Sequence, residues 1–550
     1  MTEPRPHGFT RRPEPHSLGS SLRGQEMVEG VLPLTGLALT GDPFAGAVGD
    51  PEQAAELHGF GWLDDLASLG NARARDMAQA RVLGWIAAHP VPPEAGGSDP
   101  VWRADVTGRR VLRWIFHSGQ ILPGLDRAAA QPVFDSLHAQ LDHLSRAEAP
   151  AGLPRIEALA GAAMAAMLLT GAEDRAEPAL AALGAAVEPS IRQGVMRGRC
   201  PESLLACLSL LGWVKACAAD GGLALPDEIS AVIEDIAPLL RALRHADGGL
   251  PRYHGGGRGV AGRLDHSLRA ASGPAVAAPG HAMGFARLSR ARATVVMDAG
   301  QPPAGPAAAH AHASTLGIEF TSARHPIVVN CGSGRMFGPA WARASRATAC
   351  HSTLCLSGLS SAKLLPPDGQ GHERLTLLPQ KVWAGRCDAE GNLLPAETPP
   401  ANPRLPETIL SGHDAWQGTH GLTHLRELQL SADGDQFSGT DTLAALDIDG
   451  QGRLAQALTN APEGIGFEIR FHLHPEIEAI AEGDDLRLQL PGAEAWYFSH
   501  DLVSTLRLEP SAYLEQGQPQ PRASVQIVLA HRLEAEAVQI GWTFMRAGAS

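Results

Sequence analysis

The stretch His310-Ala-His-Ala-Ser-Thr-Leu-Gly-Ile-Glu-Phe320 joins two histidines to an apolar run rich in strand-forming residues. Side chains two residues apart in an extended chain point to the same side, so His310 and His312 are expected to share one face of a strand. Two imidazoles on one face suit a metal site or an acid–base pair. The alternative is a polar strand entry with two solvated histidines. The stretch also lies near the point in the sequence where helix-like patterns give way to strand-like ones.

From about residue 280 onward, short β-rich runs are separated by glycine, proline and Asp-Gly turns, which predicts antiparallel sandwich sheets. The expected strands cover residues 293–298, 315–320, 326–330, 352–356, 466–474, 486–490 and 524–530. Between residues 51 and 245 the apolar residues recur every three or four positions instead, which predicts helices. These helices cover residues 74–88, 103–120, 128–144, 154–169, 202–218 and 226–243. Their short connections favour antiparallel pairs, in a bundle or a closed ring of hairpins.

The order of the elements, helices first and strands second, predicts an α+β protein of separate domains. We expect a mobile lead-in rich in proline and glycine at residues 1–50, a helical domain at 51–275 and a β-sandwich domain at 280–547. The glycine-rich segment 255–279 is the expected linker.

Charge and composition exclude several classes of protein. The chain has 45 Lys and Arg against 59 Asp and Glu, a net charge of −14, which argues against a nucleic-acid binder. Seven cysteines without a CxxC pair are too few for a disulfide framework. No secretory signal and no membrane-spanning run is recognised, so the sequence predicts a cytoplasmic protein. The oligomeric state is left open.

Tyrosine and lysine are scarce, with three of each against 23 histidines. Only Tyr253 lies between the two predicted domains, in the loop Asp247-Gly-Gly-Leu-Pro-Arg-Tyr-His254. A loop held by rigid elements is a common place for a catalytic side chain, and a turn that packs Tyr253 against the helical domain is the alternative. His472 and His474, within a late strand, are expected on a solvent-exposed face.

Arginines concentrate around this loop. Nine of them lie between Arg241 and Arg292, against the two acids Asp247 and Asp265. A basic lining of this kind would attract an anionic substrate, whereas a solvated linker is the plain alternative.

Three segments together resemble the heparinase II/III-like family of polysaccharide lyases. They are the stretch that begins at His310, then Ile327-Val-Val-Asn-Cys-Gly332, then Ala347-Thr-Ala-Cys-His-Ser-Thr-Leu354. Weaker similarity lies at residues 58–63, 155–169 and 467–474. The resemblance covers most of the chain from about residue 50. It implies an N-terminal incomplete (α/α) toroid of helical hairpins followed by antiparallel β-sandwich sheets.

The resemblance also implies a reaction, β-elimination at a uronic acid of an acidic polysaccharide. This chemistry needs a group that neutralises the carboxylate, a base that removes the C5 proton and an acid that protonates the leaving oxygen. By the resemblance, Tyr253 and His310 are the expected catalytic residues. The expected substrate-binding residues are Arg197, Arg199, Arg252 and His254.

A structural zinc ion in the β domain is implied as well, without an organic cofactor. Its expected ligands are His312, Asn330 and His351. Asn330 stands where relatives often have a carboxylate, and an amide is the poorer zinc ligand.

One departure from the family pattern keeps three hypotheses open. Where relatives place Asn or His to neutralise the uronate, this chain has Met196 and Cys200, which cannot do so, beside Arg197 and Arg199. The chain is an active lyase, a catalytically lapsed glycan-binding relative associated with the cell envelope, or an unrelated toroid hydrolase, which would need two carboxylates flanking the bond. The position of Tyr253 separates the first two: a cleft favours the lyase, and a core favours the binding protein.

Overall fold

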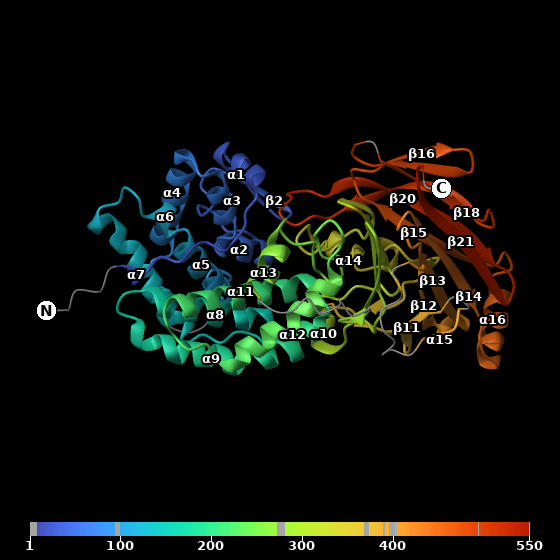
Figure 1. The fold of residues 1–550 in the computed structure, drawn as a ribbon, viewed down its shortest axis with the longest axis horizontal. Coiled ribbons are helices and arrows are strands. Elements are labelled where there is room, and N and C mark those ends of the chain that lie inside the picture. The colour runs from blue at the N-terminus through green and yellow to red at the C-terminus, as the bar shows by residue number, and fades with distance from the viewer. Residues whose placement is uncertain are drawn as a thin grey trace.

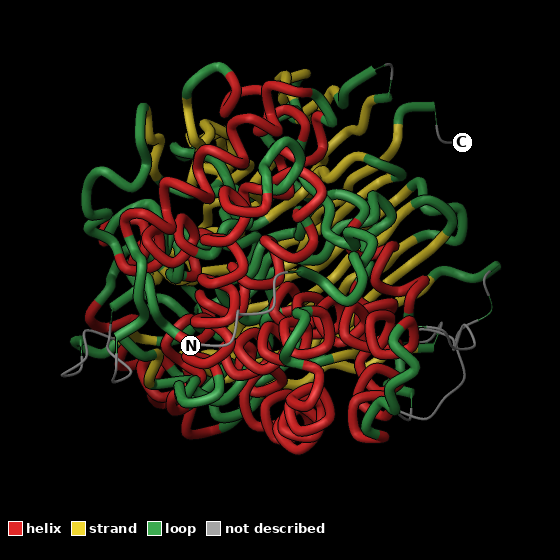
Figure 2. The backbone as a smooth tube through the Cα atoms, turned by 90° about the vertical axis from the view of Figure 1, so that its left-hand side faces the viewer, coloured by secondary structure: helices red, strands yellow, loops and turns green. Residues whose placement is uncertain are grey.

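The computed structural model describes residues 8–93, 99–271, 281–367, 373–388, 391–394, 402, 404–492 and 494–548. Helices fill the first part of the chain and strands the second, and the two parts lie end to end (Figure 1). Seen from the helical end, the helices stand in front of the sheets (Figure 2). This arrangement confirms the predicted fold class, a toroid-like helical part followed by antiparallel sheets.

Each helix predicted from the apolar spacing is present, within a few residues of its expected bounds. The helices of the first part are α1 Ser21–Val28, α2 Pro51–His58, α3 Trp62–Leu69, α4 Ala72–Ala88, α5 Ala104–Phe116, α6 Ser118–Ile121, α7 Arg127–Leu144, α8 Leu153–Leu168, α9 Ala176–Pro189, α10 Met196–Gly198, α11 Pro201–Asp220, α12 Asp227–Leu243 and α13 Arg263–Ala270. Pro154 and Pro201 lie in the first turns of α8 and α11, where a missing N–H costs nothing.

Helix α8 is the centre of the helical part. It contacts α5, α7, α9 and α11, and it carries apolar residues on all sides because nearly all of its surface is buried. A Cβ on Gly161 would lie 2.5 Å from the Cα of Gly108 on α5, so only glycine allows the two helices to approach this closely.

Helix α11 is, among the described helices, the one long and apolar enough to cross a membrane by length and composition. However, 61% of its apolar window is buried inside the protein. Such burial is typical of a core helix.

The second part consists of two antiparallel sheets. One has the strand order β19 Thr505–Tyr513, β20 Arg522–Leu533, β15 Ile465–Leu473, β7 His325–Val329, β6 Ile318–Ser322, β5 Ala293–Asp298, β4 Phe285–Arg290 and β3 His281–Ala282, with β8 Leu354–Leu356 also paired to β15. The other has the order β11 Val382–Cys387, β12 Glu407–Trp416, β13 Leu422–Leu430, β14 Gln436–Ala444, β21 Ala537–Arg546, β18 Ala495–His500, β17 Asp485–Gln489 and β16 Glu478–Glu482. Two small hairpins are β1 Val31–Leu34 with β2 Leu37–Thr40, and β9 Lys363–Leu364 with β10 Leu375–Thr376. The helices here are α14 Pro339–Ala344, α15 Gln417–His420 and α16 Ile448–Asn460.

An aromatic core joins the two sheets. The rings of Phe320 on β6 and Phe437 on β14 lie 4.9 Å apart, and those of Phe471 on β15 and Trp542 on β21 lie 4.8 Å apart. All four side chains are buried. Alternation along the strands sends these residues inward and polar residues outward, which is the sandwich pattern that the sequence predicts.

In the described part of the lead-in, residues 8–50, segments are docked on the helical part. The backbone N–H of Thr10 donates to the carbonyl of Leu168 at 2.8 Å, and the guanidinium of Arg11 donates to the carbonyl of Cys217 at 2.6 Å. Helix α1 lies on α3. Buried Met27 and Leu32 anchor the segment, but such short apolar groups show no clear periodicity in the sequence.

Candidate functional site

The loop between α12 and α13 lies against β5, β6 and β7, and it carries Tyr253. The side chain of Tyr253 is fully buried. Its hydroxyl lies 2.7 Å from the carbonyl oxygen of Gly317 and 3.1 Å from that of Val296, to which it donates. Burial raises the pKa of the phenol well above its ordinary value. The structure therefore places Tyr253 in the core, not in a cleft, which argues against its predicted catalytic role.

Arg199 also differs from its predicted role in substrate binding. Its Nη2 lies 2.6 Å from Oδ1 of Asp298, and both side chains are buried. The guanidinium further donates to the carbonyl oxygens of Met283, Gly284, Gly300 and Gln301. These five hydrogen bonds use all five N–H groups of the guanidinium, so Arg199 has no donor left for a substrate. The side chain instead holds α10 against the β domain.

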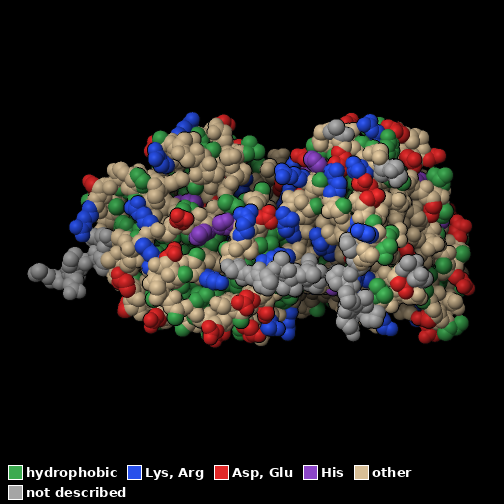
Figure 3. Space-filling view, in the orientation of Figure 1, with side chains coloured by type: hydrophobic (Ala, Val, Ile, Leu, Met, Phe, Trp, Pro, Cys, Tyr) green, Lys and Arg blue, Asp and Glu red, His purple; other side chains and the backbone are tan. Residues whose placement is uncertain are grey.

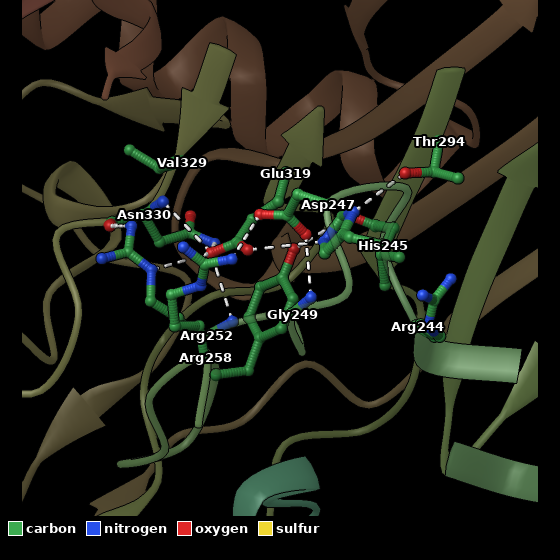
Figure 4. Close-up of polar contacts among 12 residues, drawn as sticks. Arg244, His245, Asp247, Gly249, Arg252, Arg258, Thr294, Glu319, Val329 and Asn330 are labelled. Atoms are coloured by element: carbon green, nitrogen blue, oxygen red, sulfur yellow. Dashed lines mark hydrogen bonds and ion pairs between the residues drawn. The ribbon is translucent and has the colours of Figure 1, made fainter. Parts of the chain in front are cut away.

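Arg252 lies in a second buried network around Glu319 on β6 (Figure 4). Oε1 of Glu319 accepts the backbone N–H of Arg252 at 3.2 Å and the side-chain amide of Asn330 at 3.1 Å, and Oε2 lies 3.6 Å from Nε2 of His245. The Arg252 guanidinium stacks over Tyr513 at 4.1 Å and donates to the carbonyl of Asn330. Burial alone would raise the pKa of Glu319, but His245 and Arg252 outweigh it and lower that pKa. Arg252 is therefore a structural residue of the junction.

His254, His312 and His351 form a buried chain of hydrogen bonds. The backbone N–H of His312 donates to Nδ1 of His254 at 3.2 Å, and Nε2 of His254 faces Oδ2 of Asp298 at 3.3 Å. Nδ1 of His312 lies 3.1 Å from Nε2 of His351, whose Nδ1 lies 2.9 Å from the carbonyl of Ala347. Since a carbonyl only accepts, the proton of His351 lies on Nδ1, and His312 donates to its Nε2. His254 is thus turned away from any substrate.

This geometry fits a zinc ion poorly. Burial lowers the pKa of His312 and His351, the latter to about 4, so both rings are neutral, as ligands must be. The third expected ligand is already engaged, because Oδ1 of Asn330 accepts the N–H of Ser352 at 3.0 Å and its amide donates to Glu319. Among the described residues no group of three or more His, Cys, Asp or Glu is placed to hold a metal ion. Zinc binding stays an untested prediction.

His310 is separated from His312, contrary to the expectation of one shared face. The segment Gly305–His310 is a 3₁₀ turn rather than a strand, so His310 is exposed while His312 is buried. Nη1 of Arg335 lies 3.2 Å from Nε2 of His310, and Nη2 of Arg335 lies 2.6 Å from Oε2 of Glu52. Nη1 of Arg335 also lies 3.5 Å from Nδ1 of His310, so the guanidinium faces both ring nitrogens and does not fix which of them carries the proton.

Glu52 continues this polar surface into the helical part. Nη1 of Arg103 lies 3.5 Å from Oε1 of Glu52, and Arg103 also pairs with Asp105 at 2.6 Å. Burial by itself would raise the pKa of Glu52, but Arg335 and Arg103 outweigh it and lower that pKa, so the carboxylate stays charged. Basic, acidic and histidine side chains gather in the middle of this face, where the two parts meet (Figure 3).

A cavity of about 430 Å³ lies beside this surface. Trp102, Arg103, Asp105, Arg146 and Glu148 line it, with Ala104, Ala147, Pro150 and Pro154. Arg146 is exposed and forms no ion pair with another described residue. All residues that line the cavity belong to the helical part, and Arg103 connects it to Glu52. We name this cavity together with the polar surface that extends from it through Glu52 and Arg335 to His310 the junction cleft. Of its residues the sequence singled out His310 alone, since nothing in the local pattern marks Glu52, Arg103 or Arg335.

Five of the nine arginines counted around the loop pair with described acids, and three of these acids, Glu319, Glu407 and Glu494, come from other segments. Arg290 pairs with Glu407 at 2.7 Å, and Arg292 pairs with Glu494. Arg258 pairs with Asp247 at 2.7 Å and Arg244 with Asp265 at 2.8 Å. Acids of other segments therefore offset part of the local excess of positive charge that the sequence shows. Arg197, the remaining predicted substrate contact, is exposed on α10.

His472 and His474 are buried, so the expectation of a solvent-exposed strand face is wrong for both. Nδ1 of His472 lies 2.8 Å from Oγ of Ser511, and the ring of His474 stacks edge-on against Tyr513 at 5.1 Å. Strand β15 lies inside its sheet, where loops of the junction cover the polar face as well.

We predict that His474 makes the stability of the protein depend on pH. Burial, assisted by Arg252 and Arg522, lowers the pKa of His474 to about 3. The unfolded chain, with a histidine pKa of about 6.5, binds the extra proton over the interval between the two values. The free energy of unfolding should therefore fall as the pH falls from about 6.5 toward 3. Urea titrations across this pH range measure the effect, and His474→Gln should lose less stability than the wild type as the pH falls. The control variant His325→Gln, at a partly exposed position, should lose as much stability as the wild type. Equal pH profiles for all three proteins would contradict the prediction.

Comparisons with known proteins define the class. The heparinase II/III-like, C-terminal family profile matches residues 273–543. Heparinase III has a similar structure, with a TM-score of 0.61 at 11% identity over 93% of this chain and 80% of that one. A mutant of the heparan sulfate lyase HepC from Pedobacter heparinus gives a TM-score of 0.54 at 13% identity, over 96% of this chain and 82% of that one. At these identities the likeness shows the fold.

The protein therefore has the fold of the polysaccharide lyases, a helical toroid with a β-sandwich. Within that class, residues 273–543 form a heparinase II/III-like C-terminal domain. Among curated proteins, FtsZ-localized protein C of Caulobacter vibrioides (strain NA1000 / CB15N) is 27% identical over 572 residues, covering 99% of this chain and 91% of that protein.

Proposed function

We propose that this protein binds an acidic, uronate-containing glycan in the junction cleft and that it has lost the β-elimination chemistry of the lyases. The observation that carries the proposal is the position of Tyr253. With its hydroxyl bonded to two carbonyls in the core, the phenol cannot reach a sugar C5 proton.

The other tyrosines offer no replacement. Tyr513 is buried under the Arg252 guanidinium, and Tyr497 lies on β18 in the other sheet. Arg199 and Arg252, two of the predicted neutralising groups, are held in buried networks. The scaffold is thus kept while its catalytic side chains serve to join the two domains.

The junction cleft retains what glycan binding needs. Arg146 at the cavity and Arg335 beside His310 offer guanidinium groups to a carboxylate. The cavity has the size of common small-ligand sites, which measure roughly 300–1,000 Å³.

A second candidate is a lyase in which His310 alone is the base. The specific observation in its favour is the exposed His310 beside the Arg335 guanidinium, which puts a candidate base next to a carboxylate-neutralising group.

One experiment separates the two candidates. The full chain is mixed with heparan sulfate, chondroitin, hyaluronan or alginate, binding is measured by calorimetry, and elimination is followed by the ultraviolet absorbance of the unsaturated uronate. We expect binding without a rise in absorbance. Arg146→Glu should weaken binding at least tenfold, while Arg127→Glu at the opposite end of α7 should not. A rise in absorbance that His310→Ala abolishes would establish the second candidate instead, and no binding to any glycan would refute both.

We further propose that the protein localises with FtsZ, as the name of the Caulobacter vibrioides relative states for that protein. The sequence by itself predicts a cytoplasmic protein, and the hypothesis of a lapsed relative associates the chain with the cell envelope; this proposal replaces both with localisation to FtsZ. A fluorescent fusion of the full chain should form a band at the division site that disperses when FtsZ is depleted. A uniform distribution in dividing cells would refute the proposal.

A further inference from the structure

The β domain holds a cavity that the proposed function does not use. It measures about 460 Å³ and lies between α15, α16, the end of β8 and the start of β15. In Figure 1, α15 and α16 lie at the end of the β domain that points away from the helical part. We infer that this cavity, which we name the α16 pocket, is a second saccharide site that takes a sugar with a carboxylate group.

The walls of the α16 pocket are fixed in place. A Cβ on Gly421, which follows α15 with φ +72°, would lie 2.0 Å from the carbonyl oxygen of Gly450, so the two helices meet backbone to backbone. Asp447 caps α16 by accepting the N–H of Gly450 at 2.6 Å, and it also accepts the side-chain amide of Gln417 at 2.6 Å. The pocket therefore needs no rearrangement before a ligand binds.

Arg453 supplies the charge that selects the ligand. Its Nε donates to the carbonyl of Gln417 at 2.8 Å, which fixes the guanidinium at the wall of the pocket. No carboxylate among the described residues pairs with it. A half-buried guanidinium with both terminal nitrogens uncommitted to an acid is suited to a bidentate carboxylate.

The remaining lining matches a sugar ring better than a simple anion. Gln456 and Asn460 follow Arg453 at helical spacing, so three polar groups share one face of α16. Burial lowers the pKa of His420, which keeps this ring neutral and able to bond a hydroxyl. The apolar side chains Leu356, Ala457 and Ile465 complete the pocket. Amides for hydroxyls, a guanidinium for a carboxylate and an apolar floor together fit a uronic acid.

Calorimetry of the full chain with three small probes tests the inference. Glucuronate should bind at least tenfold more tightly than glucose, which lacks the carboxylate, and than acetate, which lacks the ring. Equal binding of acetate, or no binding of glucuronate, would overturn the inference.

Variants assign the binding to one cavity. Arg453→Gln and Gln456→Trp should each weaken glucuronate binding at least tenfold. The matched control Gln451→Trp, on a part of α16 that does not line the pocket, should leave it unchanged. Arg146→Glu, which disables the junction cleft, should remove only the glucuronate binding of that cleft and leave the binding that depends on Arg453, which separates the two sites. Binding that survives in Arg453→Gln but is lost in Arg146→Glu would overturn the α16 pocket without touching the proposed function.

Discussion

Replacing Asp298 with alanine is expected to lower the free energy of unfolding by about 3–5 kcal/mol, because it leaves the buried guanidinium of Arg199 without its counter-charge. Ser314 donates to the other carboxylate oxygen at 2.6 Å and would lose this bond as well. Arg199 has φ +50°, a conformation that costs free energy in a residue other than glycine, so these bonds also hold a strained backbone. Urea denaturation measures the change.

The control is Asp265→Ala. Asp265 pairs with Arg244 at 2.8 Å, but the two side chains are 36% and 37% exposed, and such pairs contribute about 0–1 kcal/mol. Equal losses in the free energy of unfolding for the two variants would contradict the conclusion that the buried Arg199–Asp298 pair holds the two parts of the chain together.

The Asp298 pair also predicts acid sensitivity. Burial alone would raise the pKa of Asp298, but Arg199 and His254 outweigh it and lower that pKa. A carboxyl group with a lowered pKa contributes stability that is complete above its unfolded pKa of about 3.9 and is lost as the pH falls toward the folded value. The difference in stability between the wild type and Asp298→Ala should therefore shrink below pH 4.

Arg426→Leu should cost a similar amount, about 3–5 kcal/mol. Arg426 on β13 is fully buried and pairs with Asp441 through Nε at 2.7 Å and Nη2 at 3.0 Å. Its Nη1 donates across the sandwich to the carbonyls of Leu316 and Ser352, in the segments that carry His312 and His351. The variant leaves the Asp441 carboxylate in the core without its cation, and it removes the hydrogen bonds that hold these two segments.

A double variant tests the reason for this loss. If most of the cost comes from the unpaired carboxylate, Arg426→Leu/Asp441→Leu should be more stable than Arg426→Leu alone, since both charges are then gone. Losses that simply add in the double variant would contradict this explanation. Thermal unfolding followed by circular dichroism provides the comparison.

These two buried pairs belong to a set of buried contacts that hold the parts of the fold together. Around Tyr253 and Arg252, groups that the family resemblance assigns to substrate are bonded to backbone carbonyls and to Glu319 of the β domain. Interactions of this kind fix one domain against the other. On the function proposed above, the surface with Arg146, Arg335 and His310 binds the glycan, and no tyrosine base is needed.

The sequence by itself determined the elements, their order and the family. Apolar spacing of three and four predicted helices such as α8, alternation predicted strands such as β5, and the segments around His312 and His351 identified the C-terminal domain. These features depend on neighbours close in the chain. The scarcity of tyrosine also left Tyr253 as the single candidate for a catalytic tyrosine, because no other tyrosine lies between the two domains in the sequence.

Only the tertiary structure decided where the side chains point and what they meet. Tyr253 and His310 look equally available in the sequence, yet one is buried and the other exposed. Arg199 finds its partner Asp298 99 residues away, and Glu52 meets Arg335 across 283 residues. The burial of a side chain and its pairing with a residue so distant in the sequence depend on how whole domains pack. Local sequence patterns do not determine that packing.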